Sequence, residues 1–243
     1  MNDKLVENAN RVFHDKTAKS YIISTKSADF TLNNFLKKVL TLAPKSAKLL
    51  DIGTGTGRIP RLVENTFQQA VGIDISYNML KEGSYTQVAQ ASCFQLPFKN
   101  GEFNIITAYS VLHHLFSHDE FFHEVYRVLD HNGWFVSDND SNALFHKRFG
   151  WWIKLRRAFF NKRKKTLSDE EKVLEKLSEF HHTKGLDGKL LLNALKNAGF
   201  DKVFIEYHHP IKMDLFTKIL SKIETKKTEK SFRYYVRIFA KKL

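Results

Sequence analysis

Residues 49–58 have the sequence Leu-Leu-Asp-Ile-Gly-Thr-Gly-Thr-Gly-Arg. A short apolar run, 48–52, leads into three glycines at alternating positions, Gly53, Gly55 and Gly57. This pattern is typical of a buried strand that turns into a helix, and glycine at such a turn lets the backbone approach a ligand closely. Open α/β sheets bind ligands beyond the carboxyl ends of their strands, so residues 49–58 predict both a fold class and a binding loop.

Strand and helix patterns alternate along the rest of the chain. Short apolar runs rich in β-branched and aromatic residues predict strands, and apolar residues at helical spacing predict helices. The predicted strands are 48–52, 69–75, 103–109, 134–137, 203–207 and 232–240, and the clearest predicted helices are 30–40, 118–129 and 186–198. This alternation indicates an α/β fold with a doubly wound, mostly parallel sheet.

The 243 residues favour a single domain, 1–243. We expect N-terminal helices in 1–45 and a core formed by 46–141 and 184–243. The remaining segment, 142–183, separates a predicted strand from its expected helix by about 40 residues, whereas such connections usually take only a few. We interpret 142–183 as an insertion that forms a helical cap.

Composition excludes several classes of protein. No run approaches the roughly 18 uninterrupted apolar residues of a membrane span, and the first eight residues lack the apolar stretch and cleavage site of a secretory signal. The single cysteine, Cys93, cannot form an internal disulfide or a cysteine zinc cluster. We therefore expect a cytoplasmic protein without structural zinc.

The formal net charge of +13 is concentrated in two segments. Residues 143–165 hold nine lysines and arginines and no acid, and residues 211–243 hold ten against three acids. The rest of the chain is slightly acidic, with a net charge of −3. Charge gathered in blocks points to a partner, whereas evenly spread charge serves solubility.

Two common nucleotide-binding loops are excluded by the residues after the glycines. The dinucleotide-binding pattern requires a third glycine at position 58, where this chain has Arg58. The phosphate-binding loop requires Gly-Lys followed by Ser or Thr, which the sequence Arg58-Ile59-Pro60 does not supply. Neither loop describes this chain.

The stretch Asp51-Ile52-Gly53-Thr54-Gly55-Thr56-Gly57 has an acid, any residue and three alternating glycines. In this it resembles the first motif of the class I S-adenosylmethionine-dependent methyltransferases. The second predicted strand brings Asp74 into place 19 residues after Gly55. This spacing is close to the roughly 20 residues expected for a carboxylate that accepts both ribose hydroxyls, so Asp74 is our candidate ribose ligand.

Further stretches resemble later motifs of the small-molecule branch of that family, the branch similar to methyltransferases of ubiquinone and menaquinone biosynthesis. They are 96–98, 101–103, 111–115 and 126–129, the last followed by the turn Asn132-Gly133. The resemblance covers about 48–137 and returns at 186–200. It implies a seven-stranded Rossmann-like sheet and S-adenosyl-L-methionine as the cofactor.

The resemblance also implies a set of cofactor-binding residues. They are Asp51, Gly53, Thr54, Gly55, Thr56, Gly57, Asp74, Ile75, Ser92, Cys93 and Tyr109. The chain departs from the family pattern at Ser92, which replaces the acid that bonds the adenine amino group, and at Asn104, which replaces an aspartate. We expect binding with altered affinity, because a serine hydroxyl and the backbone of Cys93 can still form hydrogen bonds. Tyr109 fits core packing and a wall of the cofactor site equally well.

Methyl transfer requires an aligned nucleophile and, for a hydroxyl, amine or carbon acid, removal of a proton. His113 and His114 follow the third recognised strand at the reaction edge of the sheet. Imidazole titrates near neutral pH, so we select His114 as the candidate catalytic base, with helix capping as the alternative role of the pair. We interpret a second pair, His181 and His182, as exposed surface.

The residues after the predicted strand 134–137 raise the question of a metal-dependent reaction. Asp138-Asn139 resembles the paired metal ligands of catechol-type O-methyltransferases. Such sites also use an acid at the end of the preceding strand, where this chain has Tyr109, a poor ligand for magnesium. We therefore expect no metal site.

Basic and aromatic residues interleave in 143–165. This pattern fits a lid whose aromatic side chains line a pocket, a helix on an anionic membrane surface, or a nucleic-acid face. We expect a methyltransferase acting on a small molecule that is lipid-like or membrane-proximal, with peripheral membrane attachment as an open location. The alternatives are an RNA methyltransferase and a non-catalytic cofactor-binding protein. Nucleic acid ranks lower because residues 108–111 lack the motif of adenine amino-methyltransferases.

Overall fold

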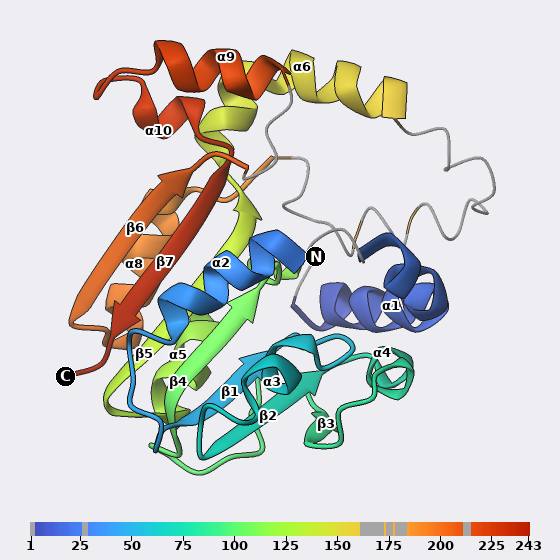
Figure 1. Ribbon diagram of the computed structural model, residues 1–243, viewed down its shortest axis with the longest axis vertical. Coiled ribbons are helices and arrows are strands. Elements are labelled where there is room, and N and C mark those ends of the chain that lie inside the picture. The colour runs from blue at the N-terminus through green and yellow to red at the C-terminus, as the bar shows by residue number, and fades with distance from the viewer. Residues whose placement is uncertain (1–2, 26–28, 161–172, 174–176, 178–183, 211–214) are drawn as a thin grey trace.

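The computed structural model describes residues 3–25, 29–160, 173, 177, 184–210 and 215–243. Its centre is a seven-stranded sheet (Figure 1). The strands are β1 (Lys48–Ile52), β2 (Gln69–Asp74), β3 (Val88–Gln90), β4 (Phe103–Tyr109), β5 (Leu129–Ser141), β6 (Lys202–His208) and β7 (Tyr235–Lys241).

The sheet has the strand order β3-β2-β1-β4-β5-β7-β6. Strands β1 to β5 pair in parallel, whereas β7 runs antiparallel to both of its neighbours, β5 and β6. This confirms the predicted doubly wound, mostly parallel sheet with seven strands. The strand order reverses between β1 and β4, and such a reversal opens a crevice at the carboxyl ends of the strands.

Helices cover both faces of the sheet (Figure 1). They are α1 (Asp3–Thr25), α2 (Asp29–Val39), α3 (Arg58–Val63), α4 (Tyr77–Glu82), α5 (Asp119–Val128), α6 (Ala143–Phe160), α8 (Gly188–Ala198), α9 (Leu215–Ile223) and α10 (Glu229–Phe232), with a 3-10 turn η2 at Leu112–His114.

Two apolar cores lie on the two faces of the sheet. Leu49 and Ile105 pack with α2 and α3, whereas their neighbours Leu50 and Ile106 pack with α5 and α8. Successive strand residues point to opposite faces, so the continuous apolar runs of β1 and β4 serve both cores. The central strands β1 and β4 are therefore buried on both sides, and the carboxyl edge of the sheet is left for a ligand.

Two predicted strands began at the wrong residue, and one short strand was missed. Strand β5 begins at Leu129 instead of Trp134, because Leu129 already has an extended backbone and pairs with Phe103. Strand β7 begins at Tyr235 instead of Phe232, because residues 229–232 form helix α10. Strand β3 was not predicted, since its three residues are too few to show a pattern.

Helices α6, α9 and α10 form a separate cluster at one end of the molecule (Figure 1). Its buried centre consists of Phe145, Ile153, Leu220 and Phe232. The side chain of Asn142 fixes the start of α6 by donating hydrogen bonds to the backbone oxygens of residues 230 and 233. Most of 142–183 beyond α6 lies outside the described residues, so a cap over the site stays a prediction.

Candidate functional site

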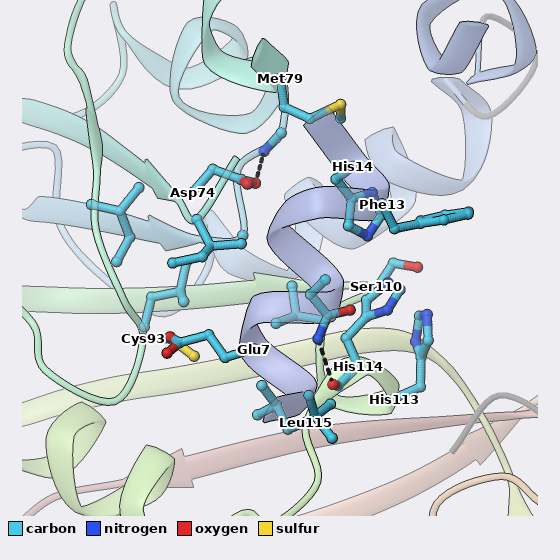
Figure 2. Close-up of a pocket in the computed structure, with 18 of the residues that line it drawn as sticks. Glu7, Phe13, His14, Asp74, Met79, Cys93, Ser110, His113, His114 and Leu115 are labelled. Atoms are coloured by element: carbon cyan, nitrogen blue, oxygen red, sulfur yellow. Dashed lines mark hydrogen bonds between the residues drawn. The ribbon is translucent and has the colours of Figure 1, made fainter. Parts of the chain in front are cut away.

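A cavity of about 400 Å³ lies at the carboxyl edge of the sheet (Figure 2). One side, which we call the sheet wall, consists of cavity-lining residues in 52–55, 73–75, 91–94 and 109–116. The opposite side, the helix wall, consists of the cavity-lining residues of α1. The volume lies within the range of about 300–1,000 Å³ that is usual for small-molecule sites.

The glycine loop forms part of the sheet wall. Gly53 has a φ of +67°, and a Cβ atom there would lie 2.5 Å from a methyl carbon of Val111. Gly55 also has a positive φ, and its backbone N–H donates a hydrogen bond to Asp74. Because the loop carries no side chains at these two positions, it leaves space in the cavity that a larger residue would fill.

Asp74 ends β2 and lines the cavity beside this loop. Its carboxylate accepts hydrogen bonds of 2.8 Å from the backbone N–H groups of Gly55 and Ser76, one at each oxygen. Burial raises the pKa of Asp74 to about 6, against the lowering effect of these two donors. The side chain is held in one orientation and remains mostly ionised at neutral pH.

Asp51 lies behind the cavity and is absent from its lining. Its buried carboxylate accepts a 2.7 Å hydrogen bond from the Thr107 hydroxyl, and burial raises its pKa to about 7. Thr54, Thr56 and Gly57 are likewise outside the lining. These residues shape the turn, and direct cofactor contact by their side chains stays a prediction.

Helix α1 closes the opposite side of the cavity (Figure 2). Asp3 accepts a 2.9 Å hydrogen bond from the backbone N–H of residue 117, and the Asn10 amide donates a 2.9 Å bond to the backbone oxygen of His114. Asp15 accepts a 2.6 Å bond from the Ser76 hydroxyl and a 3.0 Å bond from the backbone N–H of residue 78. Polar side chains therefore attach α1 along its length.

The segment after β3 forms one end of the cavity. Cys93 and Phe94 line it, and Glu7 of α1 faces them. The hydroxyl of Ser92 donates a hydrogen bond to the Glu7 carboxylate, although Ser92 itself is absent from the lining. Burial and the nearby Glu7 raise the pKa of the Cys93 thiol far above its usual range. Cys93 therefore stays a neutral thiol and acts here as an apolar surface.

A group of histidines, His14, His113 and His114, lies around η2 (Figure 2). His113 Nδ1 lies 2.7 Å from a carboxylate oxygen of Asp140, which is fully buried at the end of β5. The rings of His113 and His114 are 4.0 Å apart between centroids, and the ring of His14 meets His114 at 5.1 Å. Burial lowers the pKa of His14 to about 4, so its ring is neutral at physiological pH.

Tyr109 has a place in the core packing, and its role in the cofactor site stays a prediction. It lines the cavity, and its ring packs against Phe35 of α2 at a centroid distance of 5.1 Å. Burial and the nearby carboxylate of Asp138 raise the pKa of its hydroxyl. Tyr109 is thus a neutral part of the wall. Ile75 lines the cavity as well, and its contact with the cofactor stays a prediction.

Asp138 forms hydrogen bonds with two side chains of the protein. It accepts a 2.7 Å hydrogen bond from His208 and a 2.6 Å bond from Arg237. Burial opposes its ionisation, but His208 and Arg237 together hold its pKa below the usual range. Within the described part of the chain, no group of three or more His, Cys, Asp and Glu side chains is arranged to hold a metal ion.

Two other predictions concern the rest of the chain. His181 and His182 lie outside the described residues. Among the helices that the structure describes, none has the length and apolar character needed to cross a membrane.

The sequence analysis expected N-terminal helices in 1–45 but missed that one of them, α1, forms the helix wall. Val6, Ala9 and Phe13 recur at helical spacing and were a usable signal for an amphipathic helix near the N-terminus. Val6 and Ala9 are buried. The sequence could not show that this helix covers the carboxyl edge, because α1 reaches it through hydrogen bonds to residues 61 to 114 positions away along the chain.

Comparisons with known proteins find similarity to methyltransferases. Residues 50–137 match the family model described as a methyltransferase domain. The malonyl-[acyl-carrier protein] O-methyltransferase of Legionella pneumophila is 30% identical over 103 residues, which make up 39% of this chain and 36% of that protein. The chain therefore spans little more than a third of that relative's length.

Solved structures share the fold at lower identity. An S-adenosylmethionine-dependent methyltransferase from Archaeoglobus fulgidus gives a TM-score of 0.61 at 17% identity and covers 91% of this chain and 99% of that one. Phosphoethanolamine N-methyltransferase 2 of Haemonchus contortus, in complex with S-adenosyl-L-methionine, gives 0.57 at 17% identity, with coverage of 86% and 52%. At these identities the likeness concerns the fold.

Proposed function

We propose that this chain, whose residues 50–137 match a methyltransferase domain, is an S-adenosylmethionine-dependent methyltransferase that transfers a methyl group from that cofactor to a small molecule. One observation carries the proposal. The sheet wall of a single cavity contains the glycine loop, the Asp74 carboxylate and His113, whose ring nitrogen lies 2.7 Å from the buried Asp140 carboxylate. Cofactor binding and proton removal would therefore take place in the same enclosed space.

The residues of the sheet wall fit S-adenosylmethionine. Each oxygen of Asp74 receives one backbone N–H and keeps lone-pair capacity for a ribose hydroxyl. Gly53 and Gly55 keep their part of the wall free of side chains. When bound, the cofactor supplies a methyl group on a sulfonium, which is already activated. The protein therefore has to orient the acceptor and, for a protonated nucleophile, remove a proton.

His113 is well arranged to remove that proton. Its Nδ1 lies 2.7 Å from the Asp140 carboxylate, which accepts hydrogen bonds when ionised, so a neutral His113 ring would hold its proton on Nδ1 and its basic lone pair on Nε2. The sequence favoured His114 as the base, and the hydrogen bond to Asp140 now favours His113. His114 then forms a neighbouring surface between His113 and His14.

A binding and transfer experiment tests the proposed function. Calorimetry should detect saturable binding of S-adenosyl-L-homocysteine, and labelled S-adenosylmethionine should transfer its methyl group to a component of a small-molecule or lipid extract. Binding without transfer to small-molecule, lipid or RNA extracts would support a non-catalytic binding protein. Transfer to RNA alone would replace the small-molecule substrate with nucleic acid.

The surface of α6 and α9 supports a lipid-like or membrane-proximal substrate. Leu215, Ile219 and Ile223 are exposed at 75%, 49% and 58% and lie four residues apart along α9. Trp151 of α6 is 61% exposed, and its ring contacts Phe216 of α9. An exposed apolar row of this kind is unusual for a surface that faces only water.

Cations flank this apolar row. Lys147 and Lys154 on α6 and Lys218 and Lys222 on α9 are exposed, and neither helix contains an acid. Aromatic and aliphatic side chains flanked by lysines match an interface with anionic lipid, where each cation contributes about 1 kcal/mol before screening. The helices follow β5 and β6, whose carboxyl ends lie at the same edge of the sheet as the cavity.

Vesicle co-sedimentation tests the membrane contact. Wild type should bind anionic vesicles better than neutral ones, and Leu215→Asp should weaken binding. Leu190→Asp is the matched control, because Leu190 is similarly exposed, at 68%, but lies on α8. Equal loss in both variants, or no binding by wild type at low salt, would contradict the membrane contact. Competition by unrelated polyanions and a steep fall with salt would indicate nucleic acid instead.

A further inference from the structure

Glu7 places a carboxylate inside the cavity from a part of the chain that carries no recognised motif. It lies on α1 and faces Cys93 (Figure 2). Its side chain accepts a hydrogen bond from the Ser92 hydroxyl, and the backbone N–H of Phe94 in turn donates a 3.1 Å bond to that hydroxyl oxygen. Because Phe94 occupies the oxygen of Ser92, the proton of Ser92 is directed to Glu7. The carboxylate is thereby held in a defined place.

The order of the strands indicates which part of a bound nucleoside would lie at this end of the cavity. Strand β2 ends at Asp74, and its neighbour β3 leads directly into residues 91–94. A nucleoside whose ribose hydroxyls bond Asp74 would extend its base past β2 toward these residues. The surroundings there are suited to a flat ring, since Ala91, Cys93 and Phe94 line the cavity with apolar surface.

An ionised carboxylate can only accept hydrogen bonds. Adenine presents an exocyclic amino group, which donates, whereas hypoxanthine presents a carbonyl oxygen at the same ring position. A carboxylate at the edge of the base site therefore attracts adenine and repels hypoxanthine, and an acceptor facing an acceptor in a partly buried site is costly.

We infer that Glu7 recognises the amino group of the adenine base and makes the site selective for adenosyl over inosyl ligands. This inference rests on the proposed function, because it takes the cofactor to be S-adenosylmethionine. Glu7 contacts the base directly, and Ser92 acts as a positioning residue that orients the Glu7 carboxylate. The acid absent at position 92 is thus supplied from α1, 85 residues earlier in the chain.

Calorimetry with two ligands tests this inference. Wild type should bind S-adenosyl-L-homocysteine at least tenfold more tightly than S-inosyl-L-homocysteine. Glu7→Gln should reduce or reverse this ratio, because the glutamine amide can donate to the carbonyl of hypoxanthine. Glu7→Ala should bring the ratio close to one. Thermal unfolding of each variant verifies that it is folded.

Asp15→Asn is the matched control. It removes one negative charge from the same helix, keeps an oxygen that can accept from Ser76, and lies outside the cavity lining. Its ratio should equal that of wild type. An unchanged ratio in Glu7→Gln and Glu7→Ala would overturn the inference and leave the proposed function standing. Failure of wild type to bind either ligand would overturn the proposed function and the inference with it.

Discussion

The two walls of the cavity are held in place by different kinds of interaction. The sheet wall is continuous with the buried core, since Gly53 packs on Val111 and Asp74 is fixed by backbone donors. The helix wall is attached through polar side chains, of which Asp3 and Asp15 are examples. The two walls therefore have different tasks. The sheet wall carries the groups that need accurate placement, and the helix wall encloses them and adds a specificity contact.

The largest expected effect concerns the base in the sheet wall. His113→Gln should lower methyl transfer by about 10²- to 10⁴-fold, the usual contribution of a general base, and leave S-adenosyl-L-homocysteine affinity within about twofold. Single-turnover transfer and calorimetry on the same sample measure the two quantities. Unchanged transfer, with a larger loss in His114→Gln, would move the base to His114.

The next effect concerns the cofactor side of the same wall. Asp74→Ala should weaken S-adenosyl-L-homocysteine binding by about 1.5–3 kcal/mol, or about 10- to 150-fold, because hydrogen bonds to a charged group are lost. The melting temperature should not fall, since burial already disfavours the ionised carboxylate. Binding as tight as that of wild type would remove Asp74 from the site.

The raised pKa of Asp74, in the sheet wall, predicts that the affinity for S-adenosyl-L-homocysteine depends on pH. We expect this dependence to come from Asp74 and not from the helix wall. Below about pH 6 the carboxyl becomes protonated and loses acceptor capacity, so affinity should fall about tenfold between pH 7 and pH 5. The contribution to folding has the opposite sign: it is fully present below the unfolded pKa, near 3.8, and is lost as the pH rises through about 6. Asp74→Asn should flatten the affinity profile, and a profile as steep as that of wild type would assign it to another group.

The smallest effect concerns attachment of the helix wall. Asp15→Ala removes the acceptor for Ser76 and for the backbone of residue 78, and two such bonds contribute about 0.5–1.5 kcal/mol each. The variant should release S-adenosyl-L-homocysteine several-fold faster and expose α1 to protease, while the sheet remains folded. Stopped-flow dissociation and limited proteolysis measure these changes. Global unfolding would show that α1 belongs to the core.

The sequence predicted the sheet wall better than the helix wall, for a physical reason. The glycine loop, Asp74 and the strands around them are local patterns, in which neighbouring residues determine the turn and the strand. The helix wall depends on contacts between distant residues, such as Glu7 with Ser92 and Asp3 with the backbone of residue 117. A single sequence without those pairings does not show where α1 docks.

The His113–Asp140 pair illustrates the same limit within the sheet wall. The sequence identified the histidines from their place after β4. Asp140 was not selected, because the predicted strand ended at Ser137. The actual strand continues to Ser141 through an irregularity between Ser137 and Asp140, which carries Asp140 to the carboxyl edge.

Titration of the wild-type protein with S-adenosyl-L-homocysteine tests the central claim most directly. The two walls together predict saturable binding of one ligand per chain, with affinity lost in Asp74→Ala and adenine selectivity lost in Glu7→Ala. Absence of binding by the folded wild type would contradict the assignment of this cavity to S-adenosylmethionine, and with it the proposed function.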